Sequence, residues 1–162
     1  MYQKILFLLG AVLSVFSACA ASHQSAVYGG LSVSQAWIRQ APPNAAVLGL
    51  FMTIDNLSER DINIVSAAAK GFKRVELHRT INDNGIMKML KQQYFKILAG
   101  GRLVLEPGSW HIMLMGFDKQ PSKGMLTSVE LLLDDGSSIG FPAETKAVAP
   151  NNHMNPSHSY SH

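Results

Sequence analysis

Residues 74–91 read RVELHRTINDNGIMKMLK, and this stretch decides the fold class. Two apolar-rich runs, Arg74–Ile81 and Ile86–Lys91, are separated by Asp83-Asn84-Gly85. Asp and Asn followed by Gly favour the tight two-residue turns that join antiparallel strands. The stretch therefore predicts a β-hairpin that carries His78 on one strand and Met89 on the other.

The same alternation of short apolar runs and turn residues continues over residues 31–146. The turns recur at intervals of about 8–15 residues, which favours an antiparallel sandwich or barrel. We therefore expect a single all-β domain, in which Ala67–Lys70 allows a short helical turn and Lys91–Leu98 either helix or strand. The other expected strands are Ala36–Gln40, Ala46–Asn56, Asp61–Ala69, Leu103–Glu106, His111–Phe117, Ser128–Leu133 and Ser138–Phe141.

Residues 1–20 are predicted to be a signal peptide. Lys4 supplies a positive charge, and an apolar run follows it as far as residue 20. A run of about 16 residues is short for a membrane span but typical of a signal-peptide core. Small residues at positions 18 and 20 suit cleavage before Ala21. The protein is therefore expected in the periplasm.

Cys19 offers an alternative to simple cleavage. The preceding residues, in the sequence FSAC, resemble a lipobox, although Phe16 stands where Leu is usual. In that case the signal would end before Cys19, which would carry a lipid and anchor the protein to the membrane. If cleavage instead falls after Ala20, the exported chain has no cysteine.

Composition excludes several function classes. The net charge is +3, and the basic residues nearest together, around positions 70–79, are mixed with an acidic one. Nucleic-acid binding normally needs a clustered basic footprint, so we expect none. A chain cleaved after Ala20 has neither a thiolate nucleophile nor the thiolate of a blue-copper site. It also has no Gly-x-Ser-x-Gly elbow. We expect no enzymatic activity.

Histidine and methionine are the unusual feature, with six His and eight Met. Residues two apart on a strand share a face, so His111 and Met113 should point the same way as Met115. Met89 would lie across the predicted hairpin from His78. Thioethers are soft ligands that suit Cu(I), and imidazole accepts copper in either oxidation state, whereas zinc rarely takes Met. These strands therefore predict a Cu(I) site.

Two other interpretations remain open. Met packs irregular core gaps well, so the chain is alternatively an exported structural or interaction β-sandwich in which these residues only pack. We assign Met52 and Met125 to such packing. A copper-dependent redox enzyme is less favoured, because the additional His cluster or Cys that such chemistry uses is missing.

Residues 147–162 differ in composition from the rest of the chain. No charged side chain follows position 147, and Pro, Asn and Ser are frequent, so we expect a disordered tail. The tail is either a plain polar extension or a segment that collects copper, including Cu(II). Its candidate ligands are His153, Met154, His158 and His162.

The spacing His-x10-Met-x21-His-x-Met resembles the signature of the periplasmic copper chaperones of the PCuAC family. Its four positions are His78, Met89, His111 and Met113, and the approach PGSWHIM at 107–113 is also similar to the family's. The resemblance covers about residues 32–146. It implies a cupredoxin-like Greek-key β-barrel that binds one Cu(I) through these four residues.

The resemblance also implies a partner. Family members deliver copper towards the Cu(A) centre of cytochrome oxidase, so the expected acceptor is an oxidase subunit, another assembly chaperone or general periplasmic copper handling. Some members carry a His/Met-rich extension that binds Cu(II), to which the tail is similar. One position departs from the family pattern: Arg79 follows His78 where Met is frequent, which predicts a cation near the site.

Overall fold

The computed structural model describes residues 26–147, and the structural statements below concern that part of the chain. It contains β-strands and no helix, so no helix there is long and apolar enough to cross a membrane. The strands are β1 (Ala26–Tyr28), β2 (Leu31–Arg39), β3 (Val47–Asn56), β4 (Ile62–Ala69), β5 (Arg74–Asp83), β6 (Ile86–Lys91), β7 (Phe95–Ile97), β8 (Arg102–Leu105), β9 (Trp110–Met115), β10 (Leu126–Leu133) and β11 (Ser138–Lys146).

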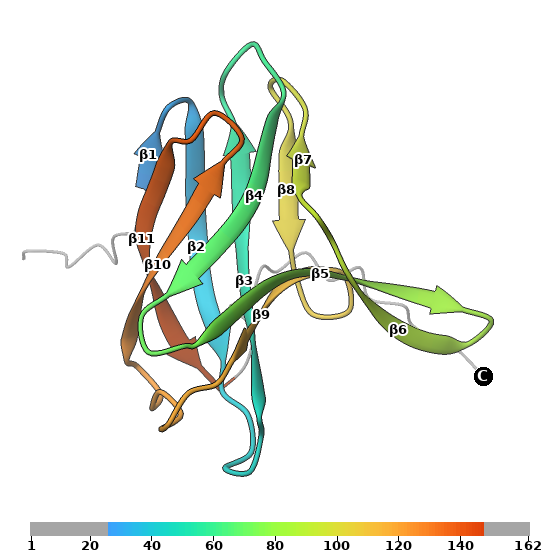
Figure 1. The fold of residues 1–162 in the computed structure, drawn as a ribbon, viewed down its shortest axis with the longest axis vertical. Helices are drawn as coiled ribbons and strands as arrows, with labels where there is room; N and C mark the ends of the chain where they lie inside the picture. The colour runs from blue at the N-terminus through green and yellow to red at the C-terminus, as the bar shows by residue number, and fades with distance from the viewer. Residues whose placement is uncertain (1–25, 148–162) are drawn as a thin grey trace, which may run out of the picture.

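The strands form one mixed sheet that folds over on itself. Its order is β6-β5-β9-β8-β3-β2-β11-β10-β4-β7, with β1 beside β2 and a further pairing of β9 with β3. The pairs β11–β2 and β8–β9 are parallel and the others antiparallel. Figure 1 shows β4 and β10 lying in front of β2 and β3, which makes two layers. The predicted all-β, cupredoxin-like fold class is confirmed.

The core lies between these layers and follows from the period-two pattern. In β10, buried Val129, Leu131 and Leu133 alternate with exposed residues. Such alternation places one face of a strand against the core. Fully buried side chains from the other layer include Leu50, Ile54, Ile112 and Leu114. On β5 and β9, the residues that alternate with these core positions point away from the core.

The β5–β6 hairpin forms where the sequence predicted it. Asp83 pairs with Ile86, and the two residues between them, Asn84 and Gly85, have φ of 53° and 86°. Positive φ at both positions is what a type I′ turn requires. Strand β6 is the edge of the sheet, every residue of it is exposed, and the hairpin extends away from the rest of the molecule (Figure 1).

Other boundaries differ from the predicted ones. Strand β2 starts at Leu31, whereas the predicted strand started only at Ala36. The prediction missed the first half because a bulge at Gln35, with φ of 55°, interrupts the alternation on which it relied. Within Lys91–Leu98, Lys91 ends β6 and Phe95–Ile97 forms β7, while the expected helical turn at the end of β4 is extended strand as far as Ala69. Neither β1 nor the second half of β11 was predicted.

Candidate metal centre

The four predicted copper ligands lie on three neighbouring strands. His78 on β5 is directly opposite His111 on β9, and Met113 is opposite Glu76. Met89 on β6 is opposite Thr80. Directly opposed residues of an antiparallel pair point to the same face. The register therefore brings all four side chains to one face of the β6-β5-β9 sheet.

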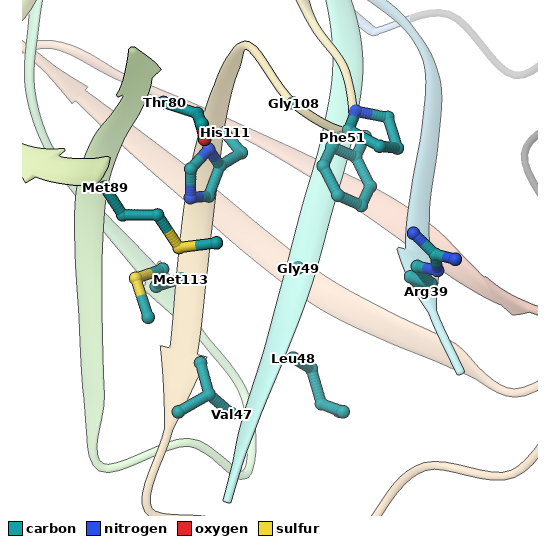
Figure 2. Close-up of a pocket in the computed structure, with 11 residues that line it drawn as sticks. Arg39, Val47, Leu48, Gly49, Phe51, Thr80, Met89, Gly108, His111 and Met113 are labelled. Atoms are coloured by element: carbon teal, nitrogen blue, oxygen red, sulfur yellow. The ribbon is translucent and has the colours of Figure 1, made fainter. Parts of the chain in front are cut away.

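A cavity of about 320 Å³ opens on this face. Figure 2 shows Met89 reaching across from β6 towards Met113 and His111, which both project from β9. His78 does not line the cavity; it is 9% exposed, and its ring centroid lies 5.8 Å from that of His111. The lining residues are Arg39, Val47, Leu48, Gly49, Phe51, Thr80, Met89, Pro107, Gly108, His111 and Met113.

His111 has one ring nitrogen fixed and one free. Its Nδ1 lies 2.9 Å from the carbonyl oxygen of Ser109, to which only a protonated Nδ1 can donate. Its Nε2 is buried and has no hydrogen-bond partner within the described residues. Burial lowers the pKa of His111, and the neighbouring His78 adds to this effect against the opposing bond to Ser109. The neutral ring therefore has a lone pair at Nε2, as a metal ligand needs.

His78 has the reverse arrangement. Its Nε2 lies 3.0 Å from Oε2 of Glu76, while Nδ1 is buried and lacks a partner in the described part of the chain. The other carboxylate oxygen of Glu76 accepts from Nζ of Lys91 at 2.9 Å. The hydrogen bond with His78, followed by that with Lys91, lowers the pKa of Glu76 to about 2. Glu76 is consequently an anion beside this face at neutral pH.

The thioethers on this face differ in their surroundings. Met89 is 63% exposed, whereas Met113 is half-buried beside the cavity. The sulfur of Met115 accepts a hydrogen bond of 3.1 Å from Nη2 of Arg74, so Met115 is already engaged. Met87 is exposed on β6 and does not line the cavity. Met89 and Met113 are thus the two thioethers that the cavity brings together.

Of the two methionines assigned to packing, Met52 is buried and Met125 is exposed. Met52 is 2% exposed and belongs to the core, as predicted. Met125 is 54% exposed, because it lies in the turn before β10 and not on an inward-facing strand position. Neither residue lies at the cavity that contains Met89 and Met113.

Arg79 does not bring a cation to this face. It is adjacent to His78 on β5 and therefore points to the opposite side of the strand. Its guanidinium carbon lies 4.7 Å from the ring centroid of Trp110, which it pairs with in the sheet. The expectation drawn from the family departure is therefore wrong: Arg79 stacks on an aromatic ring away from the cavity.

Three contributors to the site were not predicted. Glu76 and Thr80 share the face of His78 because they lie two residues before and after it, a period-two signal present in the sequence. Gly49 lies opposite Met113 on β3, and a Cβ there would come within 2.6 Å of the Phe51 ring. The absence of a side chain at Gly49 lets Phe51 form the far wall of the cavity.

The candidate ligands on this face differ in donor type from those of the usual zinc and iron sites. Among residues 26–147 no group of three or more His, Cys, Asp or Glu side chains is placed to hold a metal ion. Sites for zinc and non-haem iron are built from such groups. Two imidazoles with two thioethers instead form a donor set suited to a soft monovalent ion.

Comparison with known proteins places the chain in a family. The sequence profile described as "Putative lipoprotein LpqE-like" matches residues 31–145. A relative from Leifsonia xyli subsp. xyli, "Putative lipoprotein Lxx21020", is 32% identical over 127 residues, in a match that covers 76% of this chain and 75% of that protein.

Two solved structures resemble the fold. The copper-bound PCuAC domain from PmoF2 has a TM-score of 0.66 at 16% identity, over 77% of this chain and 99% of that one. The CuI-DR1885 solution structure from Deinococcus radiodurans has a TM-score of 0.56 at 28% identity, over 69% of this chain and 75% of that one. The fold is thus that of PCuAC domains, and the chain belongs to the LpqE-like family.

Proposed function

We propose that this protein is an exported copper chaperone that binds one Cu(I) through His78, Met89, His111 and Met113. The observation that carries the proposal is the arrangement of donors on one sheet face. Met89, His111 and Met113 line an open cavity, and within the described residues one buried ring nitrogen of His111 and one of the adjacent His78 have no hydrogen-bond partner. The likeness to the CuI-DR1885 and copper-bound PmoF2 structures supports the same cargo.

The donor set suits transfer better than permanent retention. All four ligands are neutral, so a bound Cu(I) would keep its single positive charge and compete with few protons. Met89 stands on an exposed edge strand. An acceptor's ligands would therefore reach the ion from the side of β6 and replace Met89 first, while His78 and His111 stay buried.

Export and anchoring extend the proposal to residues 1–20, which lie outside the described residues. The relative from Leifsonia xyli and the matching family are both described as lipoproteins. This supports the Cys19 alternative, in which a lipid holds the copper domain at the periplasmic membrane surface. Mass spectrometry of the exported protein would separate a lipidated Cys19 from a chain that begins at Ala21.

Metal titration of the exported protein tests the copper site. We expect one equivalent of Cu(I), measured by competition with a chromogenic Cu(I) chelator, and much weaker Zn(II) binding. Thioethers favour the soft ion, so equal affinities for the two metals would contradict the assignment. Absence of Cu(I) binding would favour the alternative, a structural or interaction sandwich.

We further propose that the acceptor is a Cu(A)-containing oxidase subunit or another chaperone of its assembly. Mixing the Cu(I)-loaded protein with the soluble Cu(A) domain, followed by separation and copper analysis, tests this step. Copper should appear on the acceptor. A protein that retains its copper beside every such acceptor would instead serve in storage or resistance.

The candidate Cu(II) tail, with His153, Met154, His158 and His162, also lies outside the described residues. The tail follows β11, whose last residue, Lys146, pairs with Arg39, and Arg39 lines the cavity. The start of the tail near the cavity supports a role there. We propose that the tail collects Cu(II) and raises its local concentration there. Truncation after Pro150 should remove Cu(II) binding and leave one Cu(I) per protein. Unchanged Cu(II) binding after truncation would show that the tail is not the Cu(II) site.

A further inference from the structure

The two histidines of the site are held in opposite ways. Each ring is oriented by a hydrogen bond to a residue two positions earlier in the chain. The partner is the carboxylate of Glu76 for His78 and the carbonyl oxygen of Ser109 for His111. Glu76 holds Nε2, whereas Ser109 holds Nδ1. The nitrogen left without a partner is therefore Nδ1 in His78 and Nε2 in His111.

We infer that Glu76 is a positioning residue for copper: it accepts a hydrogen bond from Nε2–H of His78 and so makes Nδ1 the nitrogen that binds the ion. This inference rests on the proposed copper site and names the atom through which one of its ligands acts. His111 binds through the other type of nitrogen, Nε2. The two imidazoles thus present unlike nitrogens to one ion.

The protonation pattern follows from the donors and acceptors present. An ionised carboxylate only accepts hydrogen bonds, so Nε2 of His78 carries the proton in the 3.0 Å contact. A neutral imidazole has one N–H, which leaves the lone pair at Nδ1. That atom is buried and has no hydrogen-bond partner among the described residues. A buried acceptor without a partner is costly unless a ligand uses it.

Glu76 is itself held in place by two cations. Nζ of Lys91, which is opposite His78 on β6, lies 2.9 Å from Oε1, and Nε of Arg74 lies 3.8 Å from the same oxygen. These contacts leave Oε2 directed at His78. A carboxylate behind a ligating histidine fixes the ring and raises its basicity as a ligand, more than a neutral carbonyl does.

Silver offers a direct readout of the binding nitrogen. Ag(I) is a Cu(I) surrogate, and the spin-½ isotope ¹⁰⁹Ag couples to a bonded ¹⁵N nucleus in NMR spectra. In ¹⁵N-labelled wild-type protein we expect coupling to Nδ1 of His78 and to Nε2 of His111. Coupling of His78 through Nε2 would overturn the inference and leave the proposed function intact. Coupling to neither histidine would instead refute the proposed ligand set.

Substitution of the carboxylate tests its causal role. Glu76→Ala should lose the Nδ1 coupling of His78, retain the Nε2 coupling of His111, and weaken Cu(I) binding about 10-fold to 100-fold. Glu76→Gln keeps an oxygen acceptor and should retain the Nδ1 coupling with a smaller loss of affinity. If Glu76→Ala keeps both the Nδ1 coupling and wild-type affinity, Glu76 does not position His78.

A matched control is available on β10. Glu130 is exposed and accepts a hydrogen bond of 2.6 Å from Ser138, far along the sheet order from β5. Glu130→Ala removes the same carboxylate from a strand and should change neither coupling nor Cu(I) affinity. If Glu76→Ala does not fold, the wild-type silver spectrum and Glu76→Gln still decide the inference.

Discussion

Strands β5 and β9 have two faces of opposite character. On one face Leu77, Ile112 and Leu114 are at most 4% exposed and pack in the core. On the other face, His78 and His111 lie among thioethers beside a cavity. Because side chains alternate along a strand, the same short segments serve both purposes without sharing a residue. Stability and metal binding should therefore be separable by mutation.

The two faces also differ in how fully their atoms are satisfied. On the core face Leu77, Ile112 and Leu114 have no polar side-chain atoms, whereas the site face leaves Nδ1 of His78, Nε2 of His111 and Oγ1 of Thr80 buried without a hydrogen-bond partner, within the described residues. Each such atom costs about 1–3 kcal/mol of stability. Local rules of folding are typically broken at functional sites, and three of the five such atoms in the described part of the chain lie on this face.

The largest effect is expected from the core face. Ile112→Ala removes a fully buried side chain and should lower the free energy of unfolding by about 2–5 kcal/mol. Urea denaturation measures the loss, and the folded fraction should still bind one Cu(I). Met52→Ala is the thioether control, because Met52 is buried in the core away from the cavity, and it should likewise lose stability alone. Weakened Cu(I) affinity in either folded variant would contradict the separation.

Substitution of the two neighbours of Ile112, which lie on the site face, should weaken copper binding and spare stability. His111→Ala and Met113→Ala should each weaken Cu(I) affinity at least about tenfold, or about 1.4 kcal/mol, with little loss of stability. Chelator competition measures the affinity. Met115→Ala is the matched control, since this sulfur shares the face but is bonded to Arg74. A Met113→Ala protein with wild-type affinity would mean that Met115 or Met87 is the true ligand.

The sequence predicted those features that depend on local periodicity. The turn at Asn84 and Gly85 and the shared face of His111 and Met113 are consequences of neighbouring residues only. The bulge at Gln35 was not predictable in this way, because a non-glycine residue with positive φ carries little sequence signal. Nor was β7, whose three residues are too few to show a period.

Register and hydrogen bonding account for the rest of the site. That His78 faces His111 depends on the pairing of β5 with β9, which tertiary packing selects and no local pattern reveals. The resemblance to a family supplied the four proposed ligands but not Glu76, since its proposed role depends on which ring nitrogen faces the carboxylate. The prediction that Arg79 lies near the site was wrong although local periodicity was sufficient to correct it. Strand alternation alone places Arg79 on the face opposite to that of His78.

The smallest effect concerns pH and the burial of His111 in the copper-free protein. Burial lowers the pKa of His111 below its ordinary value of about 6.5. The unfolded chain then binds the proton more readily than the folded one, so stability rises with pH between the two pKa values. This contribution is complete above about pH 6.5 and is lost as the pH falls through the folded pKa. Glu76, with its pKa lowered to about 2, stays ionised throughout that window.

An NMR titration of the imidazole ¹⁵N signals should therefore find His111 half-protonated below pH 6.5. Urea denaturation at pH 7.5 and at pH 5 should show that wild-type protein loses more stability in acid than His111→Ala does. His78→Ala should return the pKa of His111 only part of the way, because burial outweighs the neighbouring ring as a cause. An imidazole that titrates at or above 6.5 would mean that water reaches His111 freely, and the contrast between the packed face and the site face would then be weaker than the structure indicates.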